Sequence, residues 1–509
     1  MFDYILPASC VLAWQAALSR YYFHMYQLNS YRPERYRKWL ESNPSKSRIL
    51  SGLVPGAAAI FLKSYASALF FGLAFFAAAN MPSEKKPFVI TARVKRQFAA
   101  AAAVLAAVGA LGLLVPPDFR RFWTAAVAAV PLAVWLPVVS GGMTAGTENR
   151  ISNTFIKTAA DKLAGSDITV VGVTGSYGKT SVKYILTEML RETYDTLMTQ
   201  GSYNTTMGVV RTINEEMTAL NRVFVCEMGA RQQGDIAEIC DIVKPKYGII
   251  TAIGIAHLET FSSTENIKKA KFELAEAIPC DGLVFLNYDS APIAAADWSG
   301  PHISYGLTDG CDYRARDISY GLFGAKFTLV CPDGRNLELS SKLLGRHNVL
   351  NIAGAAAVAI TMGVPDRSIA AAVRRLKPIP HRLELKPPAG DRVFIDDAYN
   401  SNPEGAAEAV NVLSSFEGVT RVLVTPGMVE LGERQYAANR EFGRQAALCC
   451  DVCIAVGRGG EAIAEGFADE GFECKLTRVA SLKEALAMLP QGKSVILLEN
   501  DLTDDLEQP

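Results

Sequence analysis

The stretch ITVVGVTGSYGKTSVKYIL, residues 168–186, predicts a buried strand, a glycine-rich turn and the start of a helix in direct succession. A turn of this kind wraps backbone N–H groups around phosphates and aims a helix N-terminus at them. The Lys179 ammonium would reach the outer phosphates, and the Thr180 hydroxyl would hold Mg²⁺. The turn departs from the general GxxxxGK[ST] pattern, because Val173 stands at its first glycine. The residues that we expect to bind a nucleotide here are Thr174, Gly175, Gly178, Lys179 and Thr180.

The sequence on the carboxyl side of this turn predicts two α/β domains with parallel sheets. Short β-branched runs such as RVFVCE (222–227) alternate with amphipathic segments such as NIKKAKFELAEAI (266–278). A second series begins near residue 392, after the proline-containing link KPIP (377–380), which is typical of a hinge. We therefore predict a central domain over residues 146–378 and a C-terminal domain over residues 379–509.

The first 145 residues differ in composition and predict membrane-spanning helices. Residues 1–150 hold 16 Lys and Arg against 6 Asp and Glu, whereas the rest of the chain holds 35 against 46. The basic residues lie between apolar stretches and the remainder is acidic, which argues against a nucleic-acid partner. About 20 apolar residues cross a bilayer as a helix. Two uncharged runs are close to this length, 98–115 and 122–140. The run 52–81 is long enough but is interrupted by Lys63, and the run 4–22 is a weaker candidate.

The basic loops predict a multi-pass protein of the cell membrane with cytoplasmic α/β domains. The segment 85–96 is rich in Lys and Arg, so the positive-inside tendency places it in the cytoplasm, and a hairpin of the next two runs returns the chain there. Residues 30–49 are also basic, and both loops cannot be cytoplasmic if 52–81 crosses once. Either the first run lies on the membrane surface or 52–81 is re-entrant, and both alternatives stay open.

Further blocks follow the phosphate turn in a fixed order. They are GSYNTTMGVV (201–210), CEMGARQQGDIAEIC (226–240), ITAIGIAHLETFSSTENIKKAKFELAE (250–276), GRHNVLNIAGAAAVA (345–359), IDDAYNSNPEGA (395–406) and GMVELGE (427–433). In order and spacing, these blocks resemble the Mur ligase family over residues 165–460. Asn400 stands where some relatives have histidine, which favours the MurF-like members, the ligases that add D-alanyl-D-alanine to the UDP-muramoyl tripeptide. The resemblance implies a central phosphate-loop domain and a Rossmann-like C-terminal domain.

Besides Thr180, three residues are candidate metal ligands. Glu227 ends a strand at the edge that faces the phosphate turn, and its carboxylate suits Mg²⁺, which prefers oxygen. A lone histidine such as His257 is more often structural, but its block implies that it helps to bind metal. By its pattern alone, Lys271 is one of several lysines on a solvated helix face, whereas the resemblance implies that it is carbamylated and becomes a ligand of a second ion. Two Mg²⁺ ions and ATP are therefore the expected cofactors.

The remaining candidate residues are assigned through the resemblance. Asn348 and Asn351 begin a predicted helix, where capping is their simplest role, and their block is expected to lie against the adenine. Arg382 and Asp397 match residues near the hinge that close over the nucleotide; an arginine suits the migrating phosphoryl group. The residues expected near the acyl substrate are Asn204, Thr205 and Asn400.

The resemblance implies ATP-dependent amide synthesis through an acyl phosphate, with catalytic roles for Lys179, Glu227, His257, Lys271 and Arg382. Two departures leave the acceptor open. The membrane segments stand where a UDP-sugar-binding domain is usual, and the usual C-terminal KGSR element is absent. We expect a lipid-linked or membrane-proximal cell-envelope precursor as acceptor and an amino acid or dipeptide as the amine. The alternatives are ligation of another amino acid onto an envelope polymer, and a catalytically silent membrane scaffold for envelope-synthesis enzymes.

Overall fold

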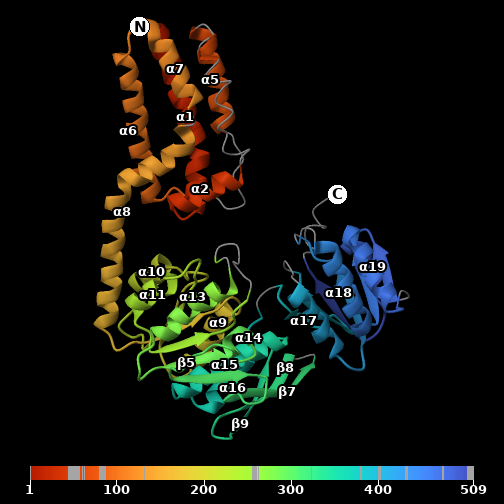
Figure 1. Cartoon of the computed structure of the whole chain (residues 1–509). Coiled ribbons are helices and arrows are strands. Elements are labelled where there is room, and N and C mark those ends of the chain that lie inside the picture. The colour runs from red at the N-terminus through yellow and green to blue at the C-terminus, as the bar shows by residue number, and fades with distance from the viewer. Residues whose placement is uncertain are drawn as a thin grey trace. The chain divides into compact units, whose positions relative to one another are not determined.

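In the computed structural model, the chain forms two compact units, Met1–Thr154 and Phe155–Pro509 (Figure 1). The residues that the structure describes are 2–43, 58–59, 61, 64–79, 88–130, 132–254, 261, 263–321, 324–378, 381–398, 403–429, 431, 434–472 and 475–500.

The first unit is α-helical in its described part. Its helices are α1 (Phe2–Leu28), α2 (Pro33–Ser42), α5 (Ser64–Ala79), α6 (Ala92–Leu114), the short 3₁₀ helix η2 (Pro117–Phe119), α7 (Arg120–Ala129) and α8 (Leu132–Ala164), which continues into the second unit. An ion pair joins α6 to α8, because Nε and Nη2 of Arg96 donate to the two carboxylate oxygens of Glu148, at 2.6 and 2.9 Å. The predicted domain limit at residue 145 falls inside α8.

The predicted span 122–140 is wrong as a single helix. The segment η2–α7 and the helix α8 are bent by 78° relative to one another at the break between residues 129 and 132. The sequence has Pro131 there, and a proline lacks the N–H group that would continue the helix. Val130 accordingly has extended backbone angles, φ −73° and ψ 130°, as residues before proline prefer.

A side chain of α1 satisfies the backbone groups that this break exposes. The Gln15 amide donates to the carbonyl oxygens of Val127 and Val130, at 3.1 and 3.2 Å. Its side-chain oxygen accepts from the N–H of Ala133 at 2.9 Å. Gln15 is 1% exposed, so the break is a built feature of the helical packing rather than a frayed end.

Among the described residues, α6 is the one helix that is by itself long and apolar enough to cross a membrane. The η2–α7 segment and α8 meet the same criterion only as a bent pair. The run 4–22 lies within α1, which does not meet it, and α5 covers only part of the run 52–81, some of which lies outside the described residues. The multi-pass arrangement therefore stays a prediction.

The second unit contains a nine-stranded sheet, as the strand–helix alternation predicted. Its order is β2-β3-β1-β4-β5-β6-β7-β8-β9, parallel from β2 to β7 and antiparallel from β7 to β9. The antiparallel part was not predicted. The strands are β1 (Thr169–Thr174), β2 (Thr196–Met198), β3 (Val223–Glu227), β4 (Tyr247–Ile250), β5 (Leu283–Asn287), β6 (His302–Gly306), β7 (Tyr313–Gly321), β8 (Gly324–Val330) and β9 (Asn336–Ser341).

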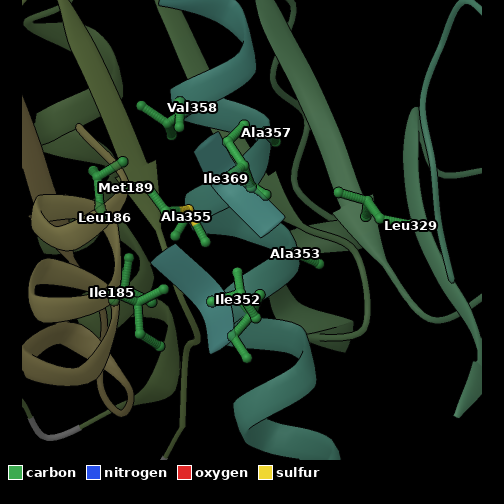
Figure 2. Packing of buried hydrophobic residues seen from close by; sticks show 14 of the residues in the cluster. Ile185, Leu186, Met189, Leu329, Ile352, Ala353, Ala355, Ala357, Val358 and Ile369 are labelled. Atoms are coloured by element: carbon green, nitrogen blue, oxygen red, sulfur yellow. The ribbon is translucent and has the colours of Figure 1, made fainter. Parts of the chain in front are cut away.

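Helices cover both faces of the parallel part, which makes it doubly wound. The helices are α9 (Lys179–Leu190), α10 (Thr206–Glu216), α11 (Asp235–Val243), α13 (Thr264–Glu276), α14 (Ala291–Ala294), α15 (Arg346–Thr361) and α16 (Asp366–Arg375). On one face α15, which is rich in alanine, packs closely against α9 and α16 (Figure 2). On the other face α10, α11 and α13 share a second core. These cores fix α9 and the loops at the carboxyl ends of β1 and β3.

A second, six-stranded sheet follows residue 378, where the second α/β domain was predicted. Its order is β10-β11-β15-β12-β13-β14, parallel except for the first pair. Its elements are β10 (Glu384–Leu385), β11 (Arg392–Asp397), α17 (Pro403–Ser414), β12 (Thr420–Thr425), α18 (Gln435–Cys449), β13 (Val452–Val456), α19 (Gly460–Asp469), β14 (Leu476–Val479), α20 (Leu482–Ala487) and β15 (Ser494–Glu499). The prediction of two parallel-sheet α/β folds is confirmed.

Candidate active site

The predicted phosphate turn connects the end of β1 to the start of α9. Its glycines have backbone conformations that side chains rarely adopt, with φ of 149° at Gly175 and 78° at Gly178. A Cβ atom at Gly175 would lie 2.0 Å from Oγ1 of Thr251, and one at Gly178 would lie 2.8 Å from Oδ1 of Asn351. The turn therefore needs both glycines. Thr174 anchors the end of β1, because its hydroxyl donates to the carbonyl of Met228 at 2.9 Å.

Lys179 is the first residue of α9, and its side chain folds back over the turn. Its Nζ donates to the carbonyl oxygens of Gly175 and Ser176, at 2.8 and 3.1 Å. Burial lowers the pKa of Lys179, and the Glu227 carboxylate partly offsets that effect. The turn thus holds a cation beside the N-terminus of a helix, which is an arrangement suited to anions.

Glu227, at the end of β3, contacts both the phosphate-loop helix and the turn 200–205. It is 1% exposed. Its Oε1 accepts from the Thr180 hydroxyl at 3.2 Å and from the Asn204 amide at 3.1 Å. Its Oε2 lies 3.0 Å from Nζ of Lys183, which is fully buried. A buried carboxylate beside a hydroxyl is a donor set of the kind that Mg²⁺ prefers, so the residues present fit this ion.

Lys271 lies on α13 and is buried, whereas solvent-facing lysines were expected on that helix from its pattern alone. Burial, followed by the positive charge of Lys179, lowers the pKa of Lys271 to about 8. The two lysines are therefore close enough for their positive charges to repel each other. His257 lies outside the described residues, and within those described no group of three or more His, Cys, Asp or Glu forms a metal site.

The start of α15 lies beside the phosphate turn and beside a cavity. Asn351 contacts Gly178, as the glycine geometry shows, while the Asn348 amide donates to the carbonyl of Leu344 at 2.7 Å. Neither asparagine is the N-cap of α15, a position that Gly345 holds. The cavity, of about 840 Å³, is lined by Tyr288, Asp289, Ala291, Ala294, Ala295, Leu307, Thr308, Arg346, His347 and Leu350.

The predicted hinge carries two non-glycine residues in the left-handed region on either side of Arg382. The φ angles are 59° at His381 and 44° at Leu383. The Leu383 N–H donates to Oδ1 of Asp397 at 2.9 Å. Burial raises the pKa of Asp397 to about 7, against the lowering effect of this hydrogen bond; the charge of Glu499 raises it further.

Of the two other residues expected near the acyl substrate, Thr205 is described by the structure and Asn400 is not. Thr205 is the N-cap of α10, and its hydroxyl oxygen accepts from the N–H of Gly208. Asn400 lies outside the described residues.

Two residues at this site were missed in the sequence. Lys183 lies one turn after Lys179 on α9, so its position at i+4 was a usable signal. His347 lines the cavity and is exposed at its surface. It stood inside the block GRHNVLN, whose asparagines alone were singled out.

Comparison with known protein families gives two matches along the second unit. Residues 173–359 match the Mur ligase middle domain, and residues 381–498 match the Mur ligase glutamate ligase domain. Together the two matches cover more than half of the chain.

Two similar relatives are named as the same enzyme. The UDP-N-acetylmuramoyl-tripeptide–D-alanyl-D-alanine ligase of Escherichia coli K12 is 31% identical over 347 residues, covering 65% of this chain and 75% of the relative. The ligase of that name from Mycobacterium tuberculosis H37Rv is 32% identical over 417 residues, covering 77% and 80%.

Solved structures agree with these relatives. MurF from Acinetobacter baumannii is similar with a TM-score of 0.56 and 29% identity, over 69% of this chain and 78% of that one. MurF from Thermotoga maritima, solved in complex with ADP, is similar with a TM-score of 0.57 and 27% identity, over 69% and 80%.

Proposed function

The chain belongs to the Mur ligase family, and from this premise we propose that it is a MurF-like, ATP-dependent amide ligase. It joins an amino acid or a D-alanyl-D-alanine-like dipeptide to the carboxylate of a UDP-muramoyl peptide or a related cell-envelope precursor. The observation that carries the proposal is the contact of Glu227 with both Thr180 of the phosphate-loop helix and Asn204 of the turn 200–205. One carboxylate thereby connects the proposed nucleotide and acceptor sites.

ATP binds, in this proposal, with its phosphates at the turn 174–180 and its base toward the cavity beside α15. The N-terminus of α9 and the Lys179 ammonium supply positive potential to the phosphates. The cavity has room for a base, and its lining includes His347. Thr180 and Glu227 would hold Mg²⁺, which when bound neutralises phosphate charge, with Lys271 and His257 proposed for a second ion.

In this proposal the reaction has two steps, phosphoryl transfer and then amide formation. A carboxylate oxygen of the acceptor attacks the γ-phosphorus of ATP, and ADP leaves to give an acyl phosphate. The amine then attacks the acyl carbon, inorganic phosphate leaves, and the nitrogen loses a proton. The acceptor carboxylate and the triphosphate repel each other, so Lys179 and Arg382 act by placing positive charge at the transferring phosphoryl group. Asn204 orients the acceptor beside Glu227.

Carbamylation of Lys271 follows from its environment in this proposal. A lysine reacts with carbon dioxide as the neutral amine, and a pKa of about 8 gives far more of that form at neutral pH than an ordinary lysine has. The product would be an anion close to Lys179, which removes the repulsion between the two cations.

Closure about residues 378–382 excludes water from the acyl phosphate, which otherwise hydrolyses. The left-handed residues His381 and Leu383 lie at this hinge. Arg382, between them, would be carried with the moving domain toward the phosphoryl group.

The first unit anchors the ligase domains at the cytoplasmic face of the membrane in this proposal. Its support is α6, which is long and apolar enough to span, and whose leucines Leu111, Leu113 and Leu114 are at least half exposed. An anchor would hold the site near a membrane-bound precursor. Extraction of membranes with alkaline carbonate tests this part: the full chain should stay in the pellet, and its release into the supernatant would contradict the anchor.

Phosphate release by the purified full chain tests the activity itself. Amino acids and dipeptides are screened with soluble UDP-muramoyl peptide and with lipid-linked precursors, comparing the parent with Lys179→Ala. We expect release that depends on both acceptor and amine, and its loss in the variant. Equal rates in the two proteins would favour the silent scaffold instead.

A further inference from the structure

The fully buried Lys183 contacts two other parts of the candidate site. We infer that Lys183 is a positioning residue, which fixes the turn 200–205 against Glu227 and the phosphate-loop helix. The inference rests on the proposed function for the roles of Glu227 and Asn204, whereas the contacts of Lys183 do not depend on it.

One ammonium makes both contacts. Nζ of Lys183 lies 3.0 Å from Oε2 of Glu227 and donates to the carbonyl oxygen of Gly201 at 2.5 Å. The side chains of Lys183 and Glu227 are 0% and 1% exposed. The ammonium donates a hydrogen bond to the Gly201 carbonyl, whereas its contact with Glu227 is an ion pair without hydrogen-bond geometry, because Oε2 has no hydrogen-bond partner. The lysine thus joins α9, the end of β3 and the beginning of the turn.

The lysine is unnecessary for the phosphate turn as such. The turn is held by Lys179, whose Nζ is bound to the carbonyls of Gly175 and Ser176, and by Thr251, whose hydroxyl donates to the carbonyl of Tyr177. A buried ion pair is in general no more stabilising than apolar side chains of the same volume. The pair of Lys183 and Glu227 is therefore better explained by what it positions than by the stability it adds.

Lys183 determines which oxygen of Glu227 faces the rest of the site. Its ammonium forms an ion pair with Oε2, and Oε1 is shared by Thr180 and Asn204. It also holds one end of the turn, at Gly201, while the N–H of Gly229 donates to the Asn204 carbonyl at the other end, at 2.7 Å. With both ends held, the Asn204 amide stays against the carboxylate.

Hydrogen exchange of the full chain tests this role without any substrate. Lys183→Met keeps the length of the side chain and removes its charge. We expect amide exchange in residues 199–205 to become about tenfold faster, with exchange in residues 174–180 and the dissociation constant of ADP within about twofold of the parent. The matched control is Lys162→Met, because Nζ of Lys162 also donates to two carbonyls, of Ile213 and Asn214, away from the site. A change in 199–205 no larger than in this control would overturn the inference.

If Lys183→Met does not fold, a second variant that also removes the opposite charge still tests the inference. Lys183→Met with Glu227→Gln removes the whole ion pair, and we expect parent-like thermal unfolding with exchange in 199–205 still raised, because the bond to Gly201 is lost. Parent-like exchange in this double variant would also overturn the inference.

Steady-state kinetics give a second readout with UDP-N-acetylmuramoyl tripeptide as the acceptor. For Lys183→Met, KM for the acceptor should rise about tenfold while KM for ATP stays within about twofold; an equal rise in both would contradict a positioning role. If the parent does not use this acceptor, the proposed function is at fault, and the exchange result alone decides on Lys183.

Discussion

The hydroxyl of Thr180 donates a hydrogen bond of 3.2 Å to Oε1 of Glu227, which joins the first turn of α9 to the end of β3. The contact depends on sheet order, because β1, which leads into α9, pairs directly with β3. Two side chains proposed to bind one magnesium ion are therefore already together.

Thr180→Val tests this pair at the metal. Valine has nearly the shape of threonine without the hydroxyl, so α9 should be retained while one oxygen ligand is lost. We expect phosphate release to fall by about 100-fold, and ADP affinity to lose its dependence on magnesium, measured by titration with and without MgCl₂.

Thr187→Val is the matched control, on the same helix. Its hydroxyl donates to the Lys183 carbonyl at 2.7 Å, within the helix, rather than to the site. Phosphate release by this variant should stay within about twofold of the parent. A magnesium dependence that persists in Thr180→Val would contradict the assigned role of Thr180.

Lys271 should destabilise the fold near neutral pH in buffer free of carbon dioxide. Its pKa is about 8 in the folded protein and about 10.4 when unfolded, so between these values the unfolded state binds more protons and stability rises with pH. Lys271→Met should therefore be more stable than the parent by about 3 kcal/mol at pH 7, with the difference lost near pH 10.5. Chemical denaturation at several pH values measures it, and a difference independent of pH would refute the assignment.

Bicarbonate distinguishes the modified lysine from the free one. With ¹³C-labelled bicarbonate, the parent should show a carbamate carbon signal by NMR, and Lys271→Met should lack it. Lys269→Met, on the same helix, is the control that should keep the signal. A signal retained in Lys271→Met would place the modification elsewhere.

The raised pKa of Asp397 predicts the opposite pH dependence of folding stability. Its folded pKa of about 7 lies above the value of about 3.9 for an unfolded chain, so the folded state binds more protons between these values and stability falls as pH rises through them. Asn at this position still accepts from Leu383. Asp397→Asn should match the parent near pH 4 and exceed its stability by roughly 2–4 kcal/mol at pH 8. Thermal unfolding across this range checks it, and parallel curves would count against a raised pKa.

The parts of the site that were predictable from sequence are those coded within one short stretch. The phosphate turn follows from a strand, two glycines and a helix in direct succession, and Glu227 follows from its place at the end of an apolar run. The contact of Glu227 with Lys183 could not be predicted in the same way, because it depends on β3 lying beside β1 in the sheet. Local sequence does not determine that order.

The break within the run 122–140 of the first unit has a different cause. Treating this run as one continuous helix counted its lack of charge and did not weigh Pro131 in the sequence, because a proline has no N–H group to continue a helix. The partner that makes the break tolerable is Gln15, more than a hundred residues earlier in the chain. Such a long-range pairing has no signal in the local pattern.

Two buried glutamines of the first unit should respond differently to the same substitution. Gln15 on α1 makes three hydrogen bonds to the backbone at the break between α7 and α8. Gln97 on α6 is equally buried, yet neither polar atom of its side chain has a hydrogen-bond partner. Gln15→Leu leaves backbone groups unsatisfied and should lower stability by about 2–4 kcal/mol, because each orphaned group costs about 1–3 kcal/mol.

Gln97→Leu should instead be neutral or raise stability by about 1–2 kcal/mol, because it replaces an unsatisfied buried amide by an apolar group of similar size. Thermal unfolding of the full chain in a mild detergent compares the two variants with the parent. A loss of stability in Gln97→Leu as large as that in Gln15→Leu would mean that the Gln97 amide is satisfied by water or by a lipid headgroup. A Gln15→Leu variant as stable as the parent would mean that the break at Pro131 does not depend on α1.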